Sequence, residues 1–254
     1  MGRIRNQKLK ISDAFHKLFQ LVKTLRRKCP WDRRQTLATI KNNVIEEAYE
    51  VLAAIEKQDR TALKEEIGDL LFLGFFLCSL MEKKGITPTE IIQDTITKYK
   101  LKHPHVFRSR KFRNTEEIVK FWHSSKKDIF EGIPESLPAL MAAKLIQERA
   151  ARVGFDWADA QGPLQKLVEE IKELEKAGSR RERVDELGDL LFSCVNLARH
   201  LKIDPEDALR KANRKFVNRF RTMQRKLIKT RLASSSVTLE EMDKIWNEVK
   251  NSKR

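Results

Sequence analysis

The sequence is poor in the residues that cross-link or interrupt a chain. Its 254 residues include three cysteines, nine glycines and seven prolines. Cys29, Cys78 and Cys194 are far apart, so they form neither a disulfide framework nor a ligand set with zinc spacing. With 35% charged residues and little glycine or proline, the composition favours long charged helices over a β-sandwich or a disordered chain.

Long apolar runs are also missing. The longest, LLFLGFFLCSLM at 70–81, has twelve residues, whereas a helix needs about 20 to span a bilayer. The first ten residues are basic, and no apolar run follows that would make them a signal peptide. We therefore expect a cytoplasmic protein that does not enter a membrane.

Negative charge is in the minority, because 52 lysines and arginines outweigh 36 acidic residues and give a formal net charge of +16. Such a surface attracts polyanions, which include nucleic acid, nucleotides and acidic membranes. No recognised nucleic-acid motif and no interleaving of aromatic with basic residues is present, so nucleic acid is not required. A basic helical module that binds nucleic acid or a partner protein, with degenerate metal sites, remains the alternative to an enzyme.

What is present is helical periodicity. Apolar residues at helical spacing predict helices at about 11–27, 36–57, 61–84 and 88–101. CPWD at 29–32 interrupts the pattern, and Thr87-Pro88-Thr89-Glu90 is a helix start with Thr at the N-cap and Glu at N3. Residues 108–138 carry Pro, Gly and charge around a short apolar patch, which predicts a linker with one short helix. No segment alternates like a strand, so the expected fold class is all-α.

The second half repeats the first. EEAYE at 46–50 matches EEIKE at 169–173, EEIGDLLF at 65–72 matches DELGDLLF at 185–192, and the helix start at 86–90 matches IDPED at 203–207. Such ordered self-similarity predicts a duplicated all-α module. A tail segment, SSSVTLEEMDKIWNEVK at 234–250, predicts one further helix.

The repeated segments carry acidic pairs at helical spacing. Residues three apart share a helix face, as Glu47 does with Glu50 and Glu66 with Asp69. An antiparallel hairpin would turn the two pairs toward each other, and four convergent carboxylates suit Mg²⁺ or Mn²⁺ shared with substrate phosphates. The same pattern recurs at Glu170, Glu173, Glu186 and Asp189. The competing interpretation, a solvated face paired with Lys and Arg, is disfavoured by the duplication of the whole arrangement.

Basic pairs follow each acidic set. Lys98 and Lys102 in the first half, and Lys215 and Arg219 in the second, each lie four residues apart on one helix face. Such cations could hold phosphates. Trp31 and Trp157 occupy matching turns, where turn packing is favoured over stacking on a base, and His200 is interpreted as a residue that caps or pairs locally.

Taken together, these motifs resemble the MazG family of nucleoside triphosphate pyrophosphohydrolases. CPWD, HPHVF at 103–107, SLPAL at 136–140 and RVGFDW at 152–157 extend the resemblance over nearly the whole chain. It implies two tandem modules of four-helix type, usually in a homodimer: residues 1–107, the linker 108–138, and residues 139–254. It also implies Mg²⁺-dependent hydrolysis of a nucleoside triphosphate to monophosphate and pyrophosphate, in nucleotide-pool sanitation or alarmone-related control.

The resemblance also implies which residues act, with the C-terminal module credited with catalysis. Glu170 and Glu173 would be catalytic. The metal ligands would be Glu170, Glu173, Glu186 and Asp189, with a second set at Glu47, Glu50, Glu66 and Asp69. The substrate would contact Lys166, Lys215, Arg219 and Trp246, with N-terminal counterparts Lys98 and Lys102. Where the family pattern would place a lysine this chain has Glu182, so Arg181 or Arg183 could take its place.

Overall fold

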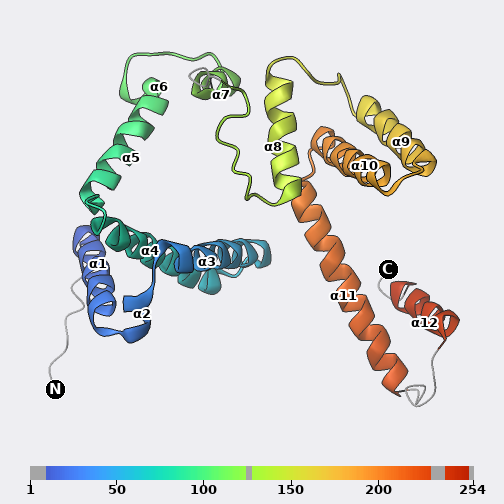
Figure 1. Ribbon diagram of the computed structural model, residues 1–254, viewed down its shortest axis with the longest axis horizontal. Coiled ribbons are helices and arrows are strands. Elements are labelled where there is room, and N and C mark those ends of the chain that lie inside the picture. The colour runs from blue at the N-terminus through green and yellow to red at the C-terminus, as the bar shows by residue number, and fades with distance from the viewer. Residues whose placement is uncertain (1–9, 124–127, 230–237, 252–254) are drawn as a thin grey trace. The chain divides into compact units, whose positions relative to one another are not determined.

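The computed structural model describes residues 10–123, 128–229 and 238–251, and within these ranges every regular element is a helix (Figure 1). The chain divides into two compact units, Met1–Thr115 and Glu116–Arg254. The all-α fold with two tandem modules is therefore confirmed. No described helix is long and apolar enough to cross a membrane.

The first unit is organised around a helical hairpin. Its helices are α1 (Ile11–Lys28), α2 (Pro30–Arg34), α3 (Leu37–Lys57), α4 (Arg60–Glu82), α5 (Pro88–Lys102) and α6 (Pro104–Phe107). α3 packs along α4, and α1 also packs against α4 (Figure 1). Because each contributes an apolar stripe, a core forms from Val22, Ile40, Leu73, Phe76 and Leu80. The predicted helices at 11–27, 36–57, 61–84 and 88–101 correspond to α1, α3, α4 and α5.

Local chemistry sets where the hairpin turns. Gln58 ends α3 in the left-handed conformation, with φ 55°. The next residue, Asp59, caps α4 by accepting hydrogen bonds from Thr61 N at 3.0 Å and Ala62 N at 3.1 Å. The chain therefore reverses at once, and α4 returns along α3.

The second unit repeats this plan. Its helices are α8 (Ala139–Arg152), α9 (Gln161–Lys176), α10 (Arg180–His200), α11 (Pro205–Lys229) and α12 (Leu239–Asn251), and the short α7 (Thr115–His123) lies within the predicted linker. α9 and α10 form the hairpin, α8 packs against α10 and α11, and α12 packs against α11 (Figure 1). The predicted tail helix begins at Leu239, and residues 234–237 of that prediction lie outside the described residues.

The interior of the second unit is unusually polar. Its buried side chains include Gln147, Arg149, Glu170, Ser193 and Asn196. Buried polar groups need hydrogen-bond partners, and Arg149 finds them by donating to Ile129 O at 3.0 Å and Glu131 O at 2.7 Å. Polar side chains at this depth indicate a functional cavity more than a packing core.

Candidate active site

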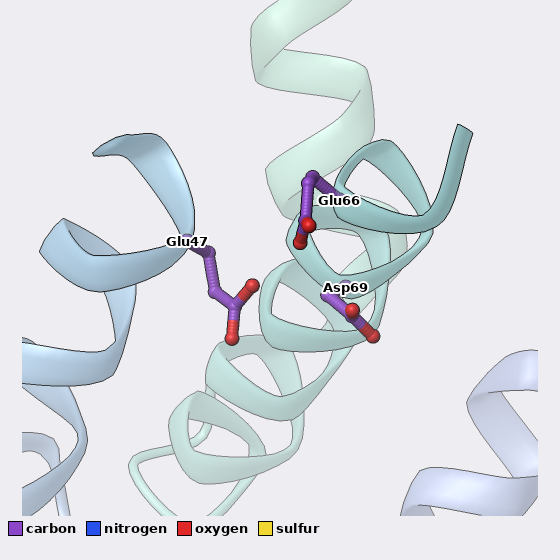
Figure 2. Close-up of side chains that lie close together, drawn as sticks. All are labelled: Glu47, Glu66 and Asp69. Carbon is purple, nitrogen blue, oxygen red and sulfur yellow. The ribbon is translucent and has the colours of Figure 1, made fainter. Parts of the chain in front are cut away.

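The N-terminal carboxylates meet across the α3–α4 hairpin. Glu47 on α3 faces Glu66 and Asp69 on α4, and each offers a carboxylate oxygen within 4.8 Å of the others (Figure 2). The pKa of Glu47 is raised mainly by burial, then by the negative charge of Asp69, and then by that of Glu50, which lies one turn further along α3. Glu47 Oε2 is buried without a hydrogen-bond partner among the described residues. A carboxylate in this position favours a bound cation.

The C-terminal module contains the matching group. Glu170 on α9 and Glu186 and Asp189 on α10 have carboxylate oxygens within 4.8 Å of one another. Glu170 is only 3% exposed, while Asp189 is exposed. The pKa of Glu186 is raised, first by burial and then by the negative charge of Glu173 and Glu170. Glu173 is therefore near the group, although it is not one of the three residues whose oxygens converge.

A lysine distinguishes the two groups. Lys166 lies one turn before Glu170, and its ammonium is 2.7 Å from Glu170 Oε1 and 2.9 Å from Glu169 Oε1. These two contacts raise the pKa of Lys166, so that it stays protonated. The position four residues before Glu47 is Asn43, which carries no charge. The two acidic groups therefore differ by one positive charge.

A cavity of about 460 Å³ opens beside the C-terminal carboxylates. Its walls are built by α8, α9, α10 and the segments flanking α8. The lining residues are Phe130, Ile146, Gln147, Ala150, Phe155, Trp157, Lys166, Glu170, Asp189, Phe192, Ser193, Asn196 and Arg199. The α10 residues run from Asp189 to Arg199, which at 1.5 Å per residue is about 15 Å along the helix axis. The cavity is thus elongated, with carboxylates and Lys166 at one end.

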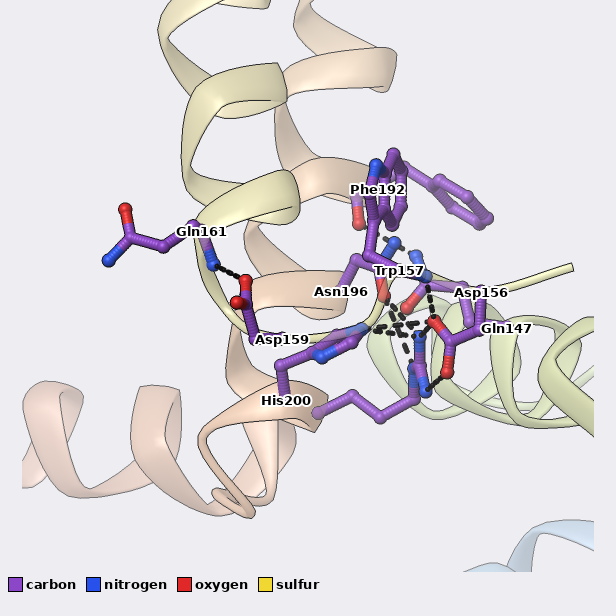
Figure 3. Close-up of polar contacts among 9 residues, drawn as sticks. Gln147, Asp156, Trp157, Asp159, Gln161, Phe192, Asn196 and His200 are labelled. Atoms are coloured by element: carbon purple, nitrogen blue, oxygen red, sulfur yellow. Dashed lines mark hydrogen bonds and ion pairs between the residues drawn. The ribbon is translucent and has the colours of Figure 1, made fainter.

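A hydrogen-bond network includes Arg199, which lines the other end of the cavity (Figure 3). Arg199 donates from Nη1 to Asp156 Oδ2 at 2.9 Å and from Nη2 to Asp156 Oδ1 at 2.5 Å, and His200 Nε2 lies 3.0 Å from the same Oδ1. The Arg199 and His200 contacts lower the pKa of Asp156 to about 2. Arg199 Nη2 also donates to Asn196 Oδ1 at 2.7 Å. The turn after α8 is thereby fixed to α10, and His200 contributes through a partner 44 residues away in the sequence, where a local cap or pair had been expected.

Trp157 was interpreted as a turn-packing residue, but its ring also lines the cavity. The ring lies against Gly162 in the first turn of α9, where a Cβ atom would come within 2.1 Å of Trp157 Cδ1. Gln147, Asn196 and Arg199 were not selected from the sequence at all. The local signals were RVGFDW at 152–157 and VNLARHL at 195–201, which served for the family resemblance and not for the site.

Other predicted contacts lie elsewhere in the chain. The residues that line the cavity do not include Lys215 and Arg219 on α11 or Trp246 on α12. Trp246 packs on Phe216 instead, with ring centroids 5.2 Å apart. Lys98 and Lys102 are on α5. Arg183 Nε donates to Ala177 O at 3.2 Å. Their proposed contacts with substrate stay predictions.

Glu182, which departs from the family pattern, has a structural role. Its Oε2 accepts hydrogen bonds from Gly178 N at 2.8 Å and Ser179 N at 3.1 Å, while Ser179 Oγ accepts from Glu182 N. This reciprocal capping box starts α10 and lowers the pKa of Glu182. A glutamate at this position therefore stabilises the helix that carries Glu186 and Asp189.

The sequence is similar to two families of pyrophosphohydrolases and to individual proteins that bear that name. Residues 35–107 match the family described as the MazG nucleotide pyrophosphohydrolase domain, and residues 142–216 match the phosphoribosyl-ATP pyrophosphohydrolase family. The nucleoside triphosphate pyrophosphohydrolase/pyrophosphatase MazG of Thermotoga maritima is 40% identical over 243 residues, covering 93% of this chain and 95% of that protein. The nucleoside triphosphate pyrophosphohydrolase of Escherichia coli K12 is 40% identical over 237 residues, covering 87% and 90%.

Proposed function

Because this chain belongs to the MazG family of nucleoside triphosphate pyrophosphohydrolases, we propose that it hydrolyses nucleoside triphosphates to nucleoside monophosphate and pyrophosphate in the cavity beside Glu170. The protein is a hydrolase of acid anhydrides. One observation carries the location of the reaction: Glu170, Asp189 and Lys166 line one end of a cavity long enough for a nucleotide, and Glu186 converges with the two carboxylates there.

The donor set fits a divalent cation. Carboxylate oxygens are the ligands that Mg²⁺ and Mn²⁺ prefer. The pKa of Glu186 is raised first by burial and then by neighbouring negative charge, and a cation would neutralise that charge. We propose Mg²⁺, held by Glu170, Glu186 and Asp189 with Glu173 at its edge. The ion would offset phosphate charge and polarise the phosphoryl group.

The chain's own groups have separate tasks at this end of the cavity. Lys166 stays protonated and presents a positive charge where phosphate oxygens would lie. Its contact with Glu170 holds one carboxylate oxygen in place, because a charge-assisted hydrogen bond restricts both side chains. Glu170 is then either a ligand or the base that receives a proton from the attacking water, two roles that the same oxygen atoms can serve.

The two modules have different prospects for catalysis. Both carry a carboxylate trio, yet only Glu170 has a lysine one turn before it, whereas Glu47 has Asn43 at that position. Negative substrate must approach negative carboxylates, so the extra positive charge favours substrate binding in the C-terminal module. We therefore assign catalysis to the C-terminal module, with residues 1–107, 108–138 and 139–254 as the proposed N-terminal module, linker and catalytic module.

The test is pyrophosphate release from each of the eight common nucleoside triphosphates with Mg²⁺. We expect turnover that is lost in Glu170→Gln and largely kept in Glu47→Gln, a matched change in the other module. A folded protein that releases no pyrophosphate from any of them would contradict the proposed activity. Equal loss in the two variants would contradict the assignment to the C-terminal module.

We also propose that the protein forms a homodimer. Val168 and Ile171 on α9, and Leu187 and Leu191 on α10, are each more than 40% exposed and lie at helical spacing. Such a stripe on the outer face of the hairpin suits a second copy of the chain. Sedimentation equilibrium would show twice the monomer mass, and Leu187→Glu should shift the protein toward monomer. A cytoplasmic role in pool sanitation or alarmone control stays a prediction.

A further inference from the structure

A second cavity, of about 500 Å³, is formed in the first unit by α1, α4 and the residue that follows α4. Its lining residues are Gln20, Lys23, Thr24, Arg26, Arg27, Ser79, Glu82 and Lys83. The N-terminal carboxylates Glu47, Glu66 and Asp69 are not among them. Ser79 follows Asp69 by ten residues, which is about 15 Å along α4. The cavity is therefore separate from the carboxylate group of the same unit.

Positive charge dominates the wall of this cavity. Four of its lining residues are cations and one, Glu82, is an anion, so the wall carries a net charge of +3. Glu82 pairs with Lys23, with 3.5 Å between Oε2 and Nζ. Within the described part of the chain, no carboxylate pairs with Arg26, Arg27 or Lys83. Like charges that share a concave wall repel one another, and a bound anion would remove that repulsion.

Arg26 is held in place without being neutralised. Its Nη1 donates to the backbone oxygen atoms of Asp32 and Gln35, the second at 2.9 Å, and the guanidinium lies over the Phe76 ring, 5.0 Å from the centroid. Carbonyl groups and an aromatic ring carry no net charge, so the full positive charge of Arg26 is kept at the cavity wall. A guanidinium fixed in this way is pre-organised to bind phosphate oxygens.

The helix dipole explains only part of this arrangement. Cations in the last turn of a helix offset its dipole, and Arg26 and Arg27 are in the last turn of α1. Lys23 lies five residues before the end of α1, where the dipole has little effect. The dipole also does not require cations from two helices to line one cavity.

We propose that this cavity binds an anion with two or more phosphate groups, held by Arg26, Arg27 and Lys83, and that inorganic pyrophosphate is such a ligand. None of the described residues that line the cavity is aromatic or aliphatic, so the wall offers no stacking surface for a nucleobase. The chemistry of the cavity thus recognises the phosphate groups themselves. Free pyrophosphate and the phosphate chain of a nucleotide share that chemistry.

The test is isothermal titration calorimetry of the full chain with pyrophosphate, in EDTA and about 0.15 M NaCl, where exposed charges are screened beyond about 8 Å. Without a divalent cation the two carboxylate groups repel phosphate, so they contribute little binding. We expect saturable binding that weakens at least about tenfold in Arg27→Gln/Lys83→Gln, which removes two charge-assisted contacts. Both side chains are exposed, so the variant is expected to fold, and Arg27→Gln alone serves if it does not.

A matched control tests whether the effect belongs to the cavity. Lys17→Gln/Lys41→Gln removes the same charge from exposed positions on α1 and α3 that do not line the cavity, and it should keep the wild-type affinity. Equal weakening in the two double variants would show attraction to the basic surface in general and would overturn the site. Wild-type affinity in Arg27→Gln/Lys83→Gln would overturn it as well.

A second titration, with ATP in the same buffer, identifies the source of the phosphates. We expect ATP to bind no more tightly than pyrophosphate, because the wall has no surface for the base. Tighter binding of ATP that is lost in Arg27→Gln/Lys83→Gln would assign the site to the phosphate chain of a nucleotide. No saturable binding of either ligand would overturn the proposal. These results do not depend on the proposed function, since binding is measured without turnover.

Discussion

Replacing Gly162 by alanine should displace Trp157 and weaken nucleotide binding. In the structure an added Cβ would lie 2.1 Å from Trp157 Cδ1 and 2.4 Å from Cγ. Carbon atoms in contact are normally about 3.5 to 4.0 Å apart, so the ring or the start of α9 must move by more than about 1 Å. Because Asp156 is held by Arg199, the indole is the part that can move, and it would rotate away from its place on the cavity wall.

The expected effect follows from what the ring contributes. Stacking of a base on an aromatic side chain is worth about 1 to 3 kcal/mol, so its loss should lower kcat/KM by roughly five- to 150-fold, mainly as a higher KM. The assay is steady-state pyrophosphate release at varied ATP. The double variant with Trp157→Ala should be no worse than Trp157→Ala alone, because the ring that Gly162 accommodates is already gone.

A control separates this effect from a general effect of alanine in helices. Gly74, in the middle of α4, has no atom within 4 Å of its added Cβ. Gly74→Ala should leave kcat/KM unchanged and raise stability by up to about 1 kcal/mol, since alanine is the better helix former. If Gly162→Ala retains the wild-type KM for ATP, or if its effect adds fully to that of Trp157→Ala, the reasoning about the ring is wrong.

Three further changes test other parts of the site. Lys166→Met should reduce kcat/KM for triphosphates by roughly 100-fold through loss of a charge facing the phosphates, and a change below threefold in a kinetic assay would contradict its role. Asp156→Asn should lower the free energy of unfolding by about 1 to 2 kcal/mol at pH 7, because the pKa of Asp156 is depressed to about 2 in the folded protein. The stabilisation is present above about pH 4 and should disappear in urea titrations as the pH falls toward 2. A difference between the two proteins that does not change with pH would refute this. Ser179→Ala should cost about 1 kcal/mol in thermal denaturation by removing the cap of α10, and no change would contradict the capping box.

The hairpins and their acidic groups could be predicted from the sequence because both depend on local spacing. Period 3.6 placed α1, α3, α4 and α5, and residues three apart placed Glu66 with Asp69 on one face. The repeat then predicted the second trio, which includes Glu186. A short connection between the two helices of each hairpin is enough to bring these carboxylates together, so local spacing and the short connection sufficed for the prediction.

The cavity could not be predicted in the same way. Its walls combine Phe130, Gln147, Trp157 and Arg199, which come from four separate segments and share no spacing. The sequence pattern of α8 shows only that one face of the helix is buried. That Gln147 Nε2 donates to Phe192 O, and that Gln147 Oε1 has no partner among the described residues, is visible only in the structure. The CPWD turn also differed from expectation, since it forms the short helix α2.

The two hairpins differ in length between their acidic residues, and their helix caps show which length changes keep the carboxylates on one face. Asp59 and Ser179 each cap a second helix whose first ligand, Glu66 or Glu186, follows seven residues later. By contrast, α3 continues ten residues beyond Glu47, whereas α9 continues six beyond Glu170. The difference of four residues is close to one helical turn of 3.6, so the ligand face is kept. Insertions and deletions between the acidic pairs are therefore expected to persist in whole turns, while single-residue changes, which rotate a carboxylate by about 100° out of the group, are removed by selection.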